Sequence, residues 1–462
     1  MLKQQIDISN EFNSTKLKEA YYKRIKNKSG KGIDGVTTTT FEKSINKNLD
    51  SIAEKIAGQK YRFSPYLQLL KSKGSGKNPR VISKPTIKDK ITLNIMKDIL
   101  HESFPTSVPR LLPNIYIRKL KEFMKTVNIS EYSFIKLDIV NFYDSLDREL
   151  LMNTIKSGIG TEEYITLLRR AIINKTVPLN CKKNKKHLFA TTKGVPQGLS
   201  ISNALANLYM KSFDDKHKSN DYAYFRYVDD ILIIAKTNMI KAIEHNTIND
   251  LEKIELTTHP LKNKTDPMSV SFDYLGYSIS SNDVSVKEST IDGFIQSVLS
   301  IFTNFKHNHE RWVDHTNGIT VEKVRETFIL KLNEKITGAI SDKKRYGWVF
   351  YFLEINDVEL LHKLDSIVTS FFYRLDEFDR IPPKNIKKFV KTYYEAKHNI
   401  QSGYIHNYDS YETLEEKLDY LIKYGVILDL NRTYSPNEIK ALFEKSKHSH
   451  LMKLEQDLGI IS

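Results

Sequence analysis

Apolar residues near the start of the chain recur at the spacing of amphipathic helices. One apolar face is formed by residues three or four positions apart: Phe41, Ile45, Leu49, Ile52 and Ile56. This spacing predicts a helix, and Gly58 is a suitable residue to end it. The segment 86–104 has a similar pattern. The N-terminal part is therefore expected to be mainly helical.

In the middle of the chain, short apolar runs replace the helical spacing of apolar residues. From about residue 131, the run Phe134-Ile-Lys-Leu-Asp138-Ile predicts a strand that ends at an acidic residue. Two further apolar runs, 223–227 and 231–235, are joined at Val228-Asp229-Asp230 and predict a β-hairpin. Aspartate tolerates turn geometry well, so carboxylates can occupy the tip. The intervening segment 202–213 is expected to be helical.

After about residue 288 the patterns are helical alone. A long amphipathic helix is predicted by one apolar stripe: Leu360, Leu361, Leu364, Ile367, Val368, Phe371, Phe372 and Leu375. Thr413 and Glu416 have the spacing of a capping box, and Ser435-Pro436 is another helix start. Central strands among helices predict an α+β fold class with a helical C-terminal region.

The charge balance points to an acidic partner. The 462 residues include 71 Lys and Arg against 56 Asp and Glu, a formal net charge of +15. Nucleic acid is the commonest partner of such a chain. The single cysteine, Cys181, excludes a disulfide scaffold and a cysteine-rich zinc module. With neither a signal peptide nor an apolar run long enough to span a bilayer, we expect a soluble, cytoplasmic protein with no membrane partner.

Three carboxylates could carry chemistry. If the two strand regions are neighbours in one sheet, Asp138 converges with Asp229 and Asp230. Two unit charges 4 Å apart repel by about 4 kcal/mol at an effective dielectric of 20, so such a group needs a cation or a raised pKa. Carboxylates without His or Cys favour Mg²⁺ or Mn²⁺, and two such ions can promote phosphoryl transfer. Taken alone, the hairpin is more often an exposed acidic turn.

Ordered blocks of sequence resemble the palm motifs of reverse transcriptases. The three main blocks are Phe134-Ile-Lys-Leu-Asp-Ile-Val-Asn-Phe-Tyr143, Gly194-Val-Pro-Gln-Gly-Leu-Ser-Ile-Ser-Asn203 and Tyr227-Val-Asp-Asp230. Four further blocks resemble the bacterial, group II intron-like branch. They are Gly32-Ile-Asp-Gly-Val36, the strand up to Arg80, Lys264 at the position of the family's motif-D lysine, and Phe272-Asp-Tyr-Leu-Gly-Tyr277. The resemblance covers about residues 30–285.

This resemblance implies a right-hand polymerase fold with an added helical C-terminal domain. The expected division is fingers with a helical extension in 1–130, palm in 131–285, thumb in 286–355 and a helical domain in 356–462. Residues 111–118, Leu-Leu-Pro-Asn-Ile-Tyr-Ile-Arg, depart from the Gly-Phe-Arg-type motif of intron enzymes.

The resemblance also implies a two-metal site. Asp138 and Asp229 would hold two Mg²⁺ ions, or Mn²⁺, with the Ile139 carbonyl as a further ligand. Asp230 is the third catalytic carboxylate and a weaker candidate for direct ligation. Tyr143 would lie beneath the sugar of the incoming nucleotide and exclude a 2′-OH, which favours dNTPs. The alternative for Tyr143 is a core aromatic residue.

Further residues are implied to bind the nucleotide. Gln197 follows a Gly-Val-Pro turn that allows backbone to approach the nascent base pair. Lys73 and Arg80 flank a Gly-Ser-Gly turn and would clamp the triphosphate, although Lys71 could replace Lys73. Lys264 is either a general acid for the leaving pyrophosphate or a solvated lysine.

The C-terminal part resembles defence-associated bacterial reverse transcriptases. The relevant segments are 332–352 and 403–409. The basic and aromatic residues around 343–348 would suit a nucleic-acid backbone, while Trp348 itself is expected in the core. A second basic-aromatic stretch, 384–394, is either a nucleic-acid contact or the solvated face of a helix.

The function implied by the resemblance is synthesis of DNA from dNTPs on a structured noncoding RNA template, in antiphage defence. The alternatives are a retron-type enzyme, untemplated or protein-primed DNA synthesis, and a non-catalytic RNA-binding scaffold. The expected partners are RNA template, DNA product and dNTPs, and a homo-oligomer is left open.

Overall fold

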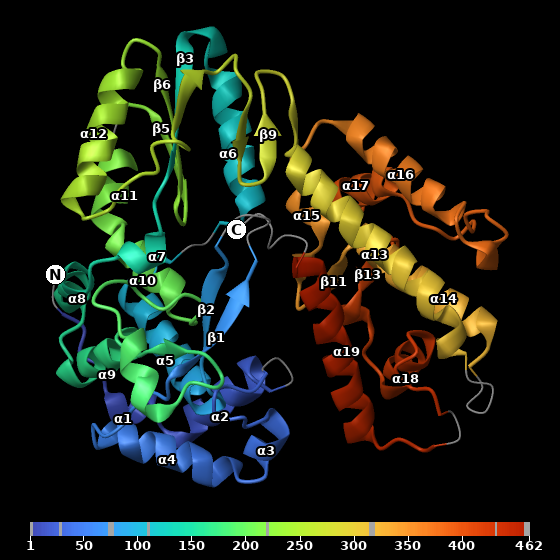
Figure 1. Cartoon of the computed structure of the whole chain (residues 1–462), viewed down its shortest axis with the longest axis horizontal. Coiled ribbons are helices and arrows are strands. Elements are labelled where there is room, and N and C mark those ends of the chain that lie inside the picture. The colour runs from blue at the N-terminus through green and yellow to red at the C-terminus, as the bar shows by residue number, and fades with distance from the viewer. Residues whose placement is uncertain are drawn as a thin grey trace. The chain divides into compact units, whose positions relative to one another are not determined.

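A computed structural model describes residues 3–26, 30–72, 78–108, 111–218, 221–313, 319–429 and 432–456. The chain forms two compact units (Figure 1). Unit 1 comprises residues 1–111 and 130–267, and unit 2 comprises 112–129 and 268–462. The four-part division expected from the sequence stays a prediction.

Unit 1 combines helices with two sheets. Its α-helices are α1 (Ile8–Glu11), α2 (Ser14–Arg24), α3 (Thr38–Glu42), α4 (Ile45–Ala57), α5 (Ile87–Ser103), α7 (Phe142–Ser145), α8 (Arg148–Gly158), α9 (Glu162–Ile172), α10 (Ser202–Tyr209), α11 (Lys211–Lys218) and α12 (Ile240–Lys253). Its strands are β1 (Tyr66–Lys71), β2 (Arg80–Lys84), β3 (Tyr132–Asp138), β4 (Thr176–Val177), β5 (Ala223–Tyr227), β6 (Asp230–Lys236) and β7 (Lys264–Pro267).

The larger sheet of unit 1 has the strand order β5-β6-β3-β7, and every neighbouring pair is antiparallel. Its two central strands are fully buried at Phe134, Ile135 and Ile231–Ile234. Helix α12 packs against β3 and α11 against β5 (Figure 1). The smaller sheet has the order β2-β1-β4, with β1 and β2 forming a hairpin. The larger sheet provides the rigid base on which the acidic residues are placed.

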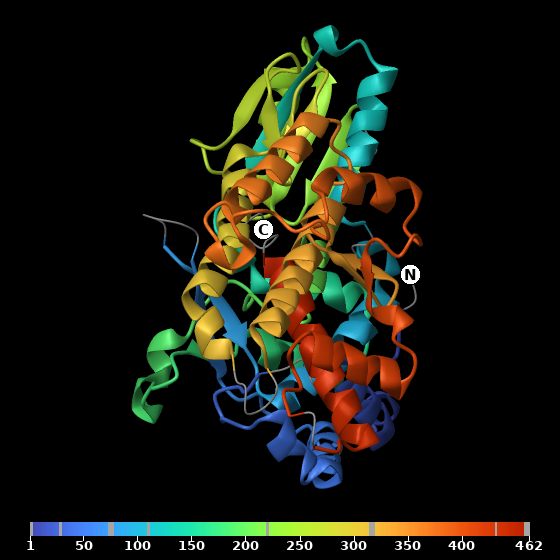
Figure 2. The same cartoon turned by 90° about the vertical axis from the view of Figure 1, so that its right-hand side faces the viewer.

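Unit 2 is mainly helical. Its α-helices are α6 (Pro113–Thr126), α13 (Glu288–Trp312), α14 (Val321–Thr337), α15 (Trp348–Tyr351), α16 (Val358–Phe372), α17 (Phe389–His398), α18 (Leu414–Lys423) and α19 (Pro436–Gln456). Its strands are β8 (Phe272–Tyr274), β9 (Tyr277–Ile279), β10 (Val284–Val286), β11 (Ala339–Ser341), β12 (Lys344–Tyr346) and β13 (His406–Asn407). Helices α13 and α14 pack against each other, as do α18 and α19 (Figure 2).

Several sequence predictions are confirmed. The apolar residues from Ile45 to Ile56 lie on α4, whose last residue precedes Gly58, whereas Phe41 lies on the separate helix α3. The hairpin forms as β5 and β6, and Thr413 and Glu416 make a capping box at the start of α18. Trp348 is buried and stacks on Phe294, with ring centroids 4.8 Å apart. These features depend on local pattern, which is why the sequence predicts them.

The expected helical segment 202–213 is confirmed, since α10 and the start of α11 cover it except for Met210. The expectation for the region after residue 288 is wrong, because β11, β12 and β13 form a three-stranded sheet there. The β11–β12 turn places Asp342 and Lys343 at positive φ, a geometry that matches the twist of a two-residue hairpin. Three-residue strands are too short to show an alternating pattern.

None of the helices in the described ranges is long and apolar enough to cross a bilayer.

Candidate active site

Asp138 and Asp230 form a directly opposed pair in the central sheet. Asp138 is the last residue of β3 and Asp230 is the first of β6, and the antiparallel register places them opposite each other. Opposed residues in such a pair have Cβ atoms about 4.5–5.5 Å apart. Asp229 precedes Asp230 at the hairpin tip. The structure therefore brings Asp138 close to Asp229 and Asp230, which are far from it in the sequence.

The hairpin tip has an unusual backbone. Tyr227 pairs with Asp230, so Val228 and Asp229 form a two-residue loop. Val228 has φ of +57°, which is rare for a β-branched residue because its branched Cβ crowds the backbone. Such a conformation persists only where surrounding contacts impose it, and it aims the Asp229 carboxylate from a fixed turn.

Arg226 braces this tip from β5. Its Nη1 donates to the Val228 carbonyl at 2.8 Å, while Nε and Nη2 donate to both carboxylate oxygens of Asp214 at 2.7 and 2.5 Å. The side chains of Arg226 and Asp214 are 6% and 11% exposed, so the pair is nearly removed from water. The Tyr224 hydroxyl also donates to Asp214. The sequence analysis missed this brace, since nothing in the local pattern of α11 indicates that Asp214 meets β5.

The carboxylates repel one another in a buried setting. Burial, with the neighbouring Asp138 charge, raises the pKa of Asp229, whereas Arg80 and Lys262 act in the opposite direction. Burial, reinforced by the Asp229 and Asp138 charges and opposed chiefly by Lys136, raises the pKa of Asp230 to about 6. A cation bound between them would relieve this repulsion.

Lys262 is a second residue of the site that the sequence analysis did not identify. Its Nζ donates to Asp138 Oδ2 at 2.5 Å, and the lysine side chain is 57% exposed. The residue lies in the turn before β7, which pairs with β3. Lys262 reaches Asp138 because β7 pairs with β3, and the sequence does not show this pairing. The only signal in the sequence is that Lys262 lies two residues before the candidate residue Lys264. Lys262 supplies a positive charge beside the first carboxylate.

Tyr143 lies close to the carboxylates. It is half-buried at the start of α7, and its hydroxyl donates to Asn203 Oδ1 of α10 at 2.5 Å. Burial and the nearby Asp229 charge raise the pKa of Tyr143. The phenol is thus neutral, and its hydrogen bond to Asn203 connects it to α10.

The turn that contains Gln197 packs closely on neighbouring backbone. Gly194 has φ of +84°, and a Cβ there would lie 2.7 Å from the Asp144 backbone; at Gly198, with φ of +95°, a Cβ would lie 2.6 Å from Ile82 Cγ2. Only glycine fits both the conformation and the space. The Gln197 carbonyl accepts from the Ser83 N–H at 2.7 Å, so the turn is joined to β2.

Arg80, one of the two residues expected to clamp the triphosphate, lies near the acidic group. It begins β2, lies opposite Lys71 of β1, and interacts electrostatically with Asp229 and Tyr143. Lys73 lies outside the described residues. Lys264 is exposed at the first position of β7 and lies opposite Lys136 of β3, two residues before Asp138. Both Arg80 and Lys264 are therefore on elements that reach the acidic group.

Oxygen donors dominate the site. The Ile139 carbonyl is left out of the two hydrogen bonds that flank it, from His259 N–H to the Asp138 carbonyl and from Val140 N–H to the Thr257 carbonyl. Within the described ranges, no group of three or more His, Cys, Asp and Glu side chains is arranged to hold a metal ion. Mg²⁺ is commonly bound through one or two carboxylates, with water and substrate phosphates completing its shell.

The central part of the chain matches a known family. Residues 71–279 match the model of the reverse transcriptase (RNA-dependent DNA polymerase) family. The COX1/OXI3 intron 2 protein of Saccharomyces cerevisiae is 26% identical over 207 residues, which cover 44% of this chain and 23% of that protein. Protein YkfC of Escherichia coli is 23% identical over 294 residues, covering 53% of this chain and 74% of that protein. The chain thus spans about a quarter of the length of the yeast intron protein.

Solved structures of telomerase are also similar. Telomerase from Candida albicans, in complex with a fragment of telomeric RNA, shares 12% identity with a TM-score of 0.42, covering 83% of this chain and 68% of that one. Telomerase from Candida tropicalis shares 17% identity with a TM-score of 0.37, covering 52% of this chain and 60% of that one. The family match over residues 71–279 includes Asp138, Asp229 and Asp230.

Proposed function

We propose that this protein synthesises DNA from dNTPs on an RNA template. The observation that supports this most strongly is the opposed pair Asp138 and Asp230 beside Asp229, inside a segment that matches the reverse transcriptase family. In the proposed reaction, the 3′-OH of a primer attacks the α-phosphate of a dNTP. The bond from the 3′-oxygen to the α-phosphorus forms and the hydroxyl proton passes to solvent. The bond from the α-phosphorus to the bridging oxygen breaks, and pyrophosphate leaves with that oxygen.

The acidic group suits two Mg²⁺ ions, or Mn²⁺. Its donors are hard oxygens from Asp138, Asp229 and the Ile139 carbonyl, with Asp230 adjacent, and burial together with the neighbouring carboxylates raises the pKa of Asp229 and of Asp230. When bound, such ions lower the pKa of the attacking hydroxyl and stabilise the leaving oxygen. Arg80 would bind the triphosphate, together with Lys73 or Lys71. Lys264 would donate a proton to the leaving pyrophosphate.

Two residues would determine the position and type of nucleotide. Tyr143, fixed by Asn203, would place its ring beneath the sugar, where a 2′-OH would clash with it. Gln197, on the glycine-rich turn joined to β2, would approach the nascent base pair. These roles predict a strong preference for dNTPs over rNTPs.

The setting we propose is antiphage defence with a structured noncoding RNA as template. The support is the likeness of segments 332–352 and 403–409 to defence-associated enzymes, together with the net charge of +15. Of the tail tyrosines that could prime synthesis, Tyr408 is 3% exposed and donates to Glu334 at 2.6 Å, which makes it a poor nucleophile in this conformation. An RNA or DNA primer is therefore favoured over Tyr408.

The decisive test is the Asp229→Ala variant. Purified wild-type protein with a primed RNA template, dNTPs and Mg²⁺ should yield labelled DNA, and Asp229→Ala should yield none while its melting curve stays cooperative. Asp215→Ala is a matched control, because that carboxylate is 58% exposed on α11 and pairs with Lys211 at the surface. Synthesis by Asp229→Ala at the wild-type rate would refute the proposal. Sequencing the product distinguishes templated from untemplated synthesis.

A further inference from the structure

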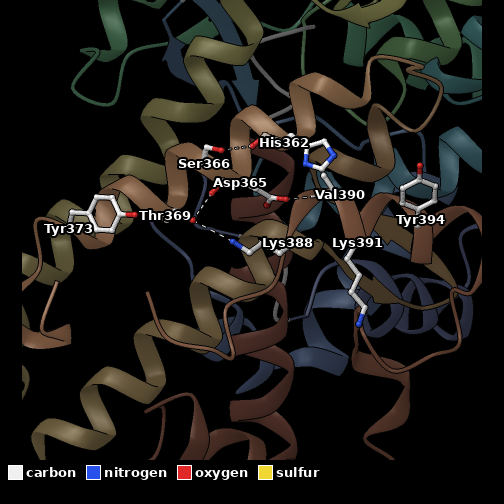
Figure 3. A pocket seen from close by; sticks show the side chains of 9 residues that line it. All are labelled: His362, Asp365, Ser366, Thr369, Tyr373, Lys388, Val390, Lys391 and Tyr394. Carbon is white, nitrogen blue, oxygen red and sulfur yellow. Dashed lines mark hydrogen bonds between the residues drawn. The ribbon is translucent and has the colours of Figure 1, made fainter. Parts of the chain in front are cut away.

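A pocket of about 770 Å³ lies in unit 2, lined by residues of α16 and α17 and the residue after α16 (Figure 3). None of the carboxylates of the candidate active site belongs to it. Its lining combines two exposed tyrosines, two lysines, hydroxyl groups and a histidine: Tyr373, Tyr394, Lys388, Lys391, Thr369 and His362. The lining thus offers aromatic ring faces beside two ammonium groups.

The two tyrosines present large ring surfaces to solvent. Tyr373 is 57% exposed and Tyr394 is 50% exposed. Figure 3 shows them on opposite sides of the pocket, with Lys388 and Lys391 between them. Tyr394 stacks against His398 at 6.3 Å between ring centroids, which restrains the ring without covering it. Exposed aromatic rings of this kind can stack on unpaired bases.

The two lysines are held by uncharged partners. Lys388 Nζ lies 3.4 Å from Thr369 Oγ1, and the Lys391 ammonium lies 4.6 Å from the centre of the Tyr404 ring. The hydroxyl and the aromatic face carry no charge, and Lys388 also interacts electrostatically with the Asp365 carboxylate of the lining. Two ammonium groups against one carboxylate leave the lining able to neutralise phosphate groups.

The one carboxylate in the lining is engaged elsewhere. Asp365 accepts from the N–H groups of Phe389 and Val390, at 2.7 and 3.3 Å, and so caps the start of α17. Segment 384–398 carries five lysines and one glutamate, which leaves the α17 side of the pocket strongly basic. The sequence analysis left this stretch open between a nucleic-acid contact and a solvated helix face.

We propose that this pocket binds a single strand of nucleic acid, with Lys388 and Lys391 on its phosphates and Tyr373 and Tyr394 stacked on its bases. The inference rests on the proposed function for the identity of the ligand, but it assigns a second contact outside the acidic group. A duplex keeps its bases paired and offers no ring face to these tyrosines, so a single strand is the better ligand.

The test measures binding of labelled dT20, rU20 and a 20-base-pair duplex by fluorescence anisotropy, without dNTPs. The Lys388→Gln/Lys391→Gln variant should bind the single strands at least tenfold more weakly. Its plot of log K against log salt should be less steep by about 1.4, since each phosphate contact on a single strand contributes about 0.7. Tyr394→Leu should weaken binding about tenfold with the salt slope unchanged.

The matched control is Lys440→Gln/Lys445→Gln, which removes the same charge from exposed positions on α19. Equal weakening by both double variants would overturn the proposal, because the effect would then reflect net charge alone. Loss confined to the duplex, or no single-strand binding by the wild type, would also overturn it. Because the assay needs no synthesis, it remains informative if polymerase activity is absent, and wild-type DNA synthesis can persist if the pocket proves empty.

Discussion

Asp138 and Asp230 lie directly opposite each other across the antiparallel pair β3 and β6, although 92 positions separate them in the sequence. Lys262, from the turn before a third strand, donates to the first of these carboxylates. Lys262 thus joins Arg80 and Lys136 as a positive charge that acts on the acidic group. This arrangement leads to the first prediction.

Replacing Lys262 by Gln should change the response to metal without abolishing synthesis. The lysine competes with a cation for Asp138 and repels it, so its removal should lower the half-saturating Mg²⁺ concentration several-fold. Titration of DNA synthesis with Mg²⁺ measures this. Lys264→Gln is the comparison: as the proposed proton donor, it should lower kcat at saturating Mg²⁺ and leave the half-saturating concentration unchanged. Identical effects of both variants would contradict the separate roles.

Tyr143 should select the sugar through its ring and not through its hydroxyl. Tyr143→Ala should raise incorporation of rNTPs relative to dNTPs at least tenfold, because the steric block is gone. Tyr143→Phe keeps the ring and loses only the bond to Asn203, so it should retain most of the dNTP preference. The ratio of kcat/KM for dNTPs to that for rNTPs measures both. A preference unchanged in Tyr143→Ala would reject the gate.

The Arg226–Asp214 pair should be a major source of stability near the hairpin. Breaking a nearly buried ion pair by removing one partner costs about 3–5 kcal/mol, because the remaining charge is buried alone. Arg226→Met should therefore lower the free energy of unfolding by about that amount and release the Val228 carbonyl. Denaturant unfolding measures the change.

Lys211→Gln provides the control for this prediction. Lys211 pairs with Asp215 on the surface of α11, and such exposed pairs contribute about 0–1 kcal/mol. A comparable loss in both variants would show that burial gives the Arg226 pair no special weight.

Glu334 should stabilise unit 2 above acidic pH. This carboxylate of α14 is 4% exposed and accepts from the Tyr408 hydroxyl at 2.6 Å and from His450 Nδ1 at 3.0 Å. Burial opposes its ionisation, but the contacts with His450, His406 and Tyr408 prevail and lower the pKa of Glu334. A lowered carboxyl pKa adds stability above the unfolded-state value, near 4.3, and that stability is lost as pH falls through the folded-state pKa.

Glu334→Gln should therefore lower the free energy of unfolding by about 1–3 kcal/mol at pH 7, with a smaller difference at pH 4. Glu326→Gln, on the same helix and 67% exposed, should change stability by less than about 0.5 kcal/mol. Urea unfolding at both pH values measures these effects. A deficit for Glu334→Gln that grows toward acidic pH would contradict the assigned charge state.

The sequence by itself determined the elements whose signals are local. Short apolar runs around Asp138 and Asp229 indicated the strands, apolar spacing indicated α4, and the ordered motifs indicated the resemblance to reverse transcriptases. Contacts between residues of distant segments depend on the tertiary structure. Lys262 reaches Asp138 because β7 pairs with β3, and Arg226 meets Asp214 because α11 packs on β5.

The small β11–β12 hairpin also depends on distant contacts, since the Asp409 carboxylate accepts from the N–H groups of Asp342 and Lys343 at its turn. Periodicity records which face of an element is buried, but strand pairing and ion pairs depend on which elements become neighbours, and that is settled by packing of the whole unit.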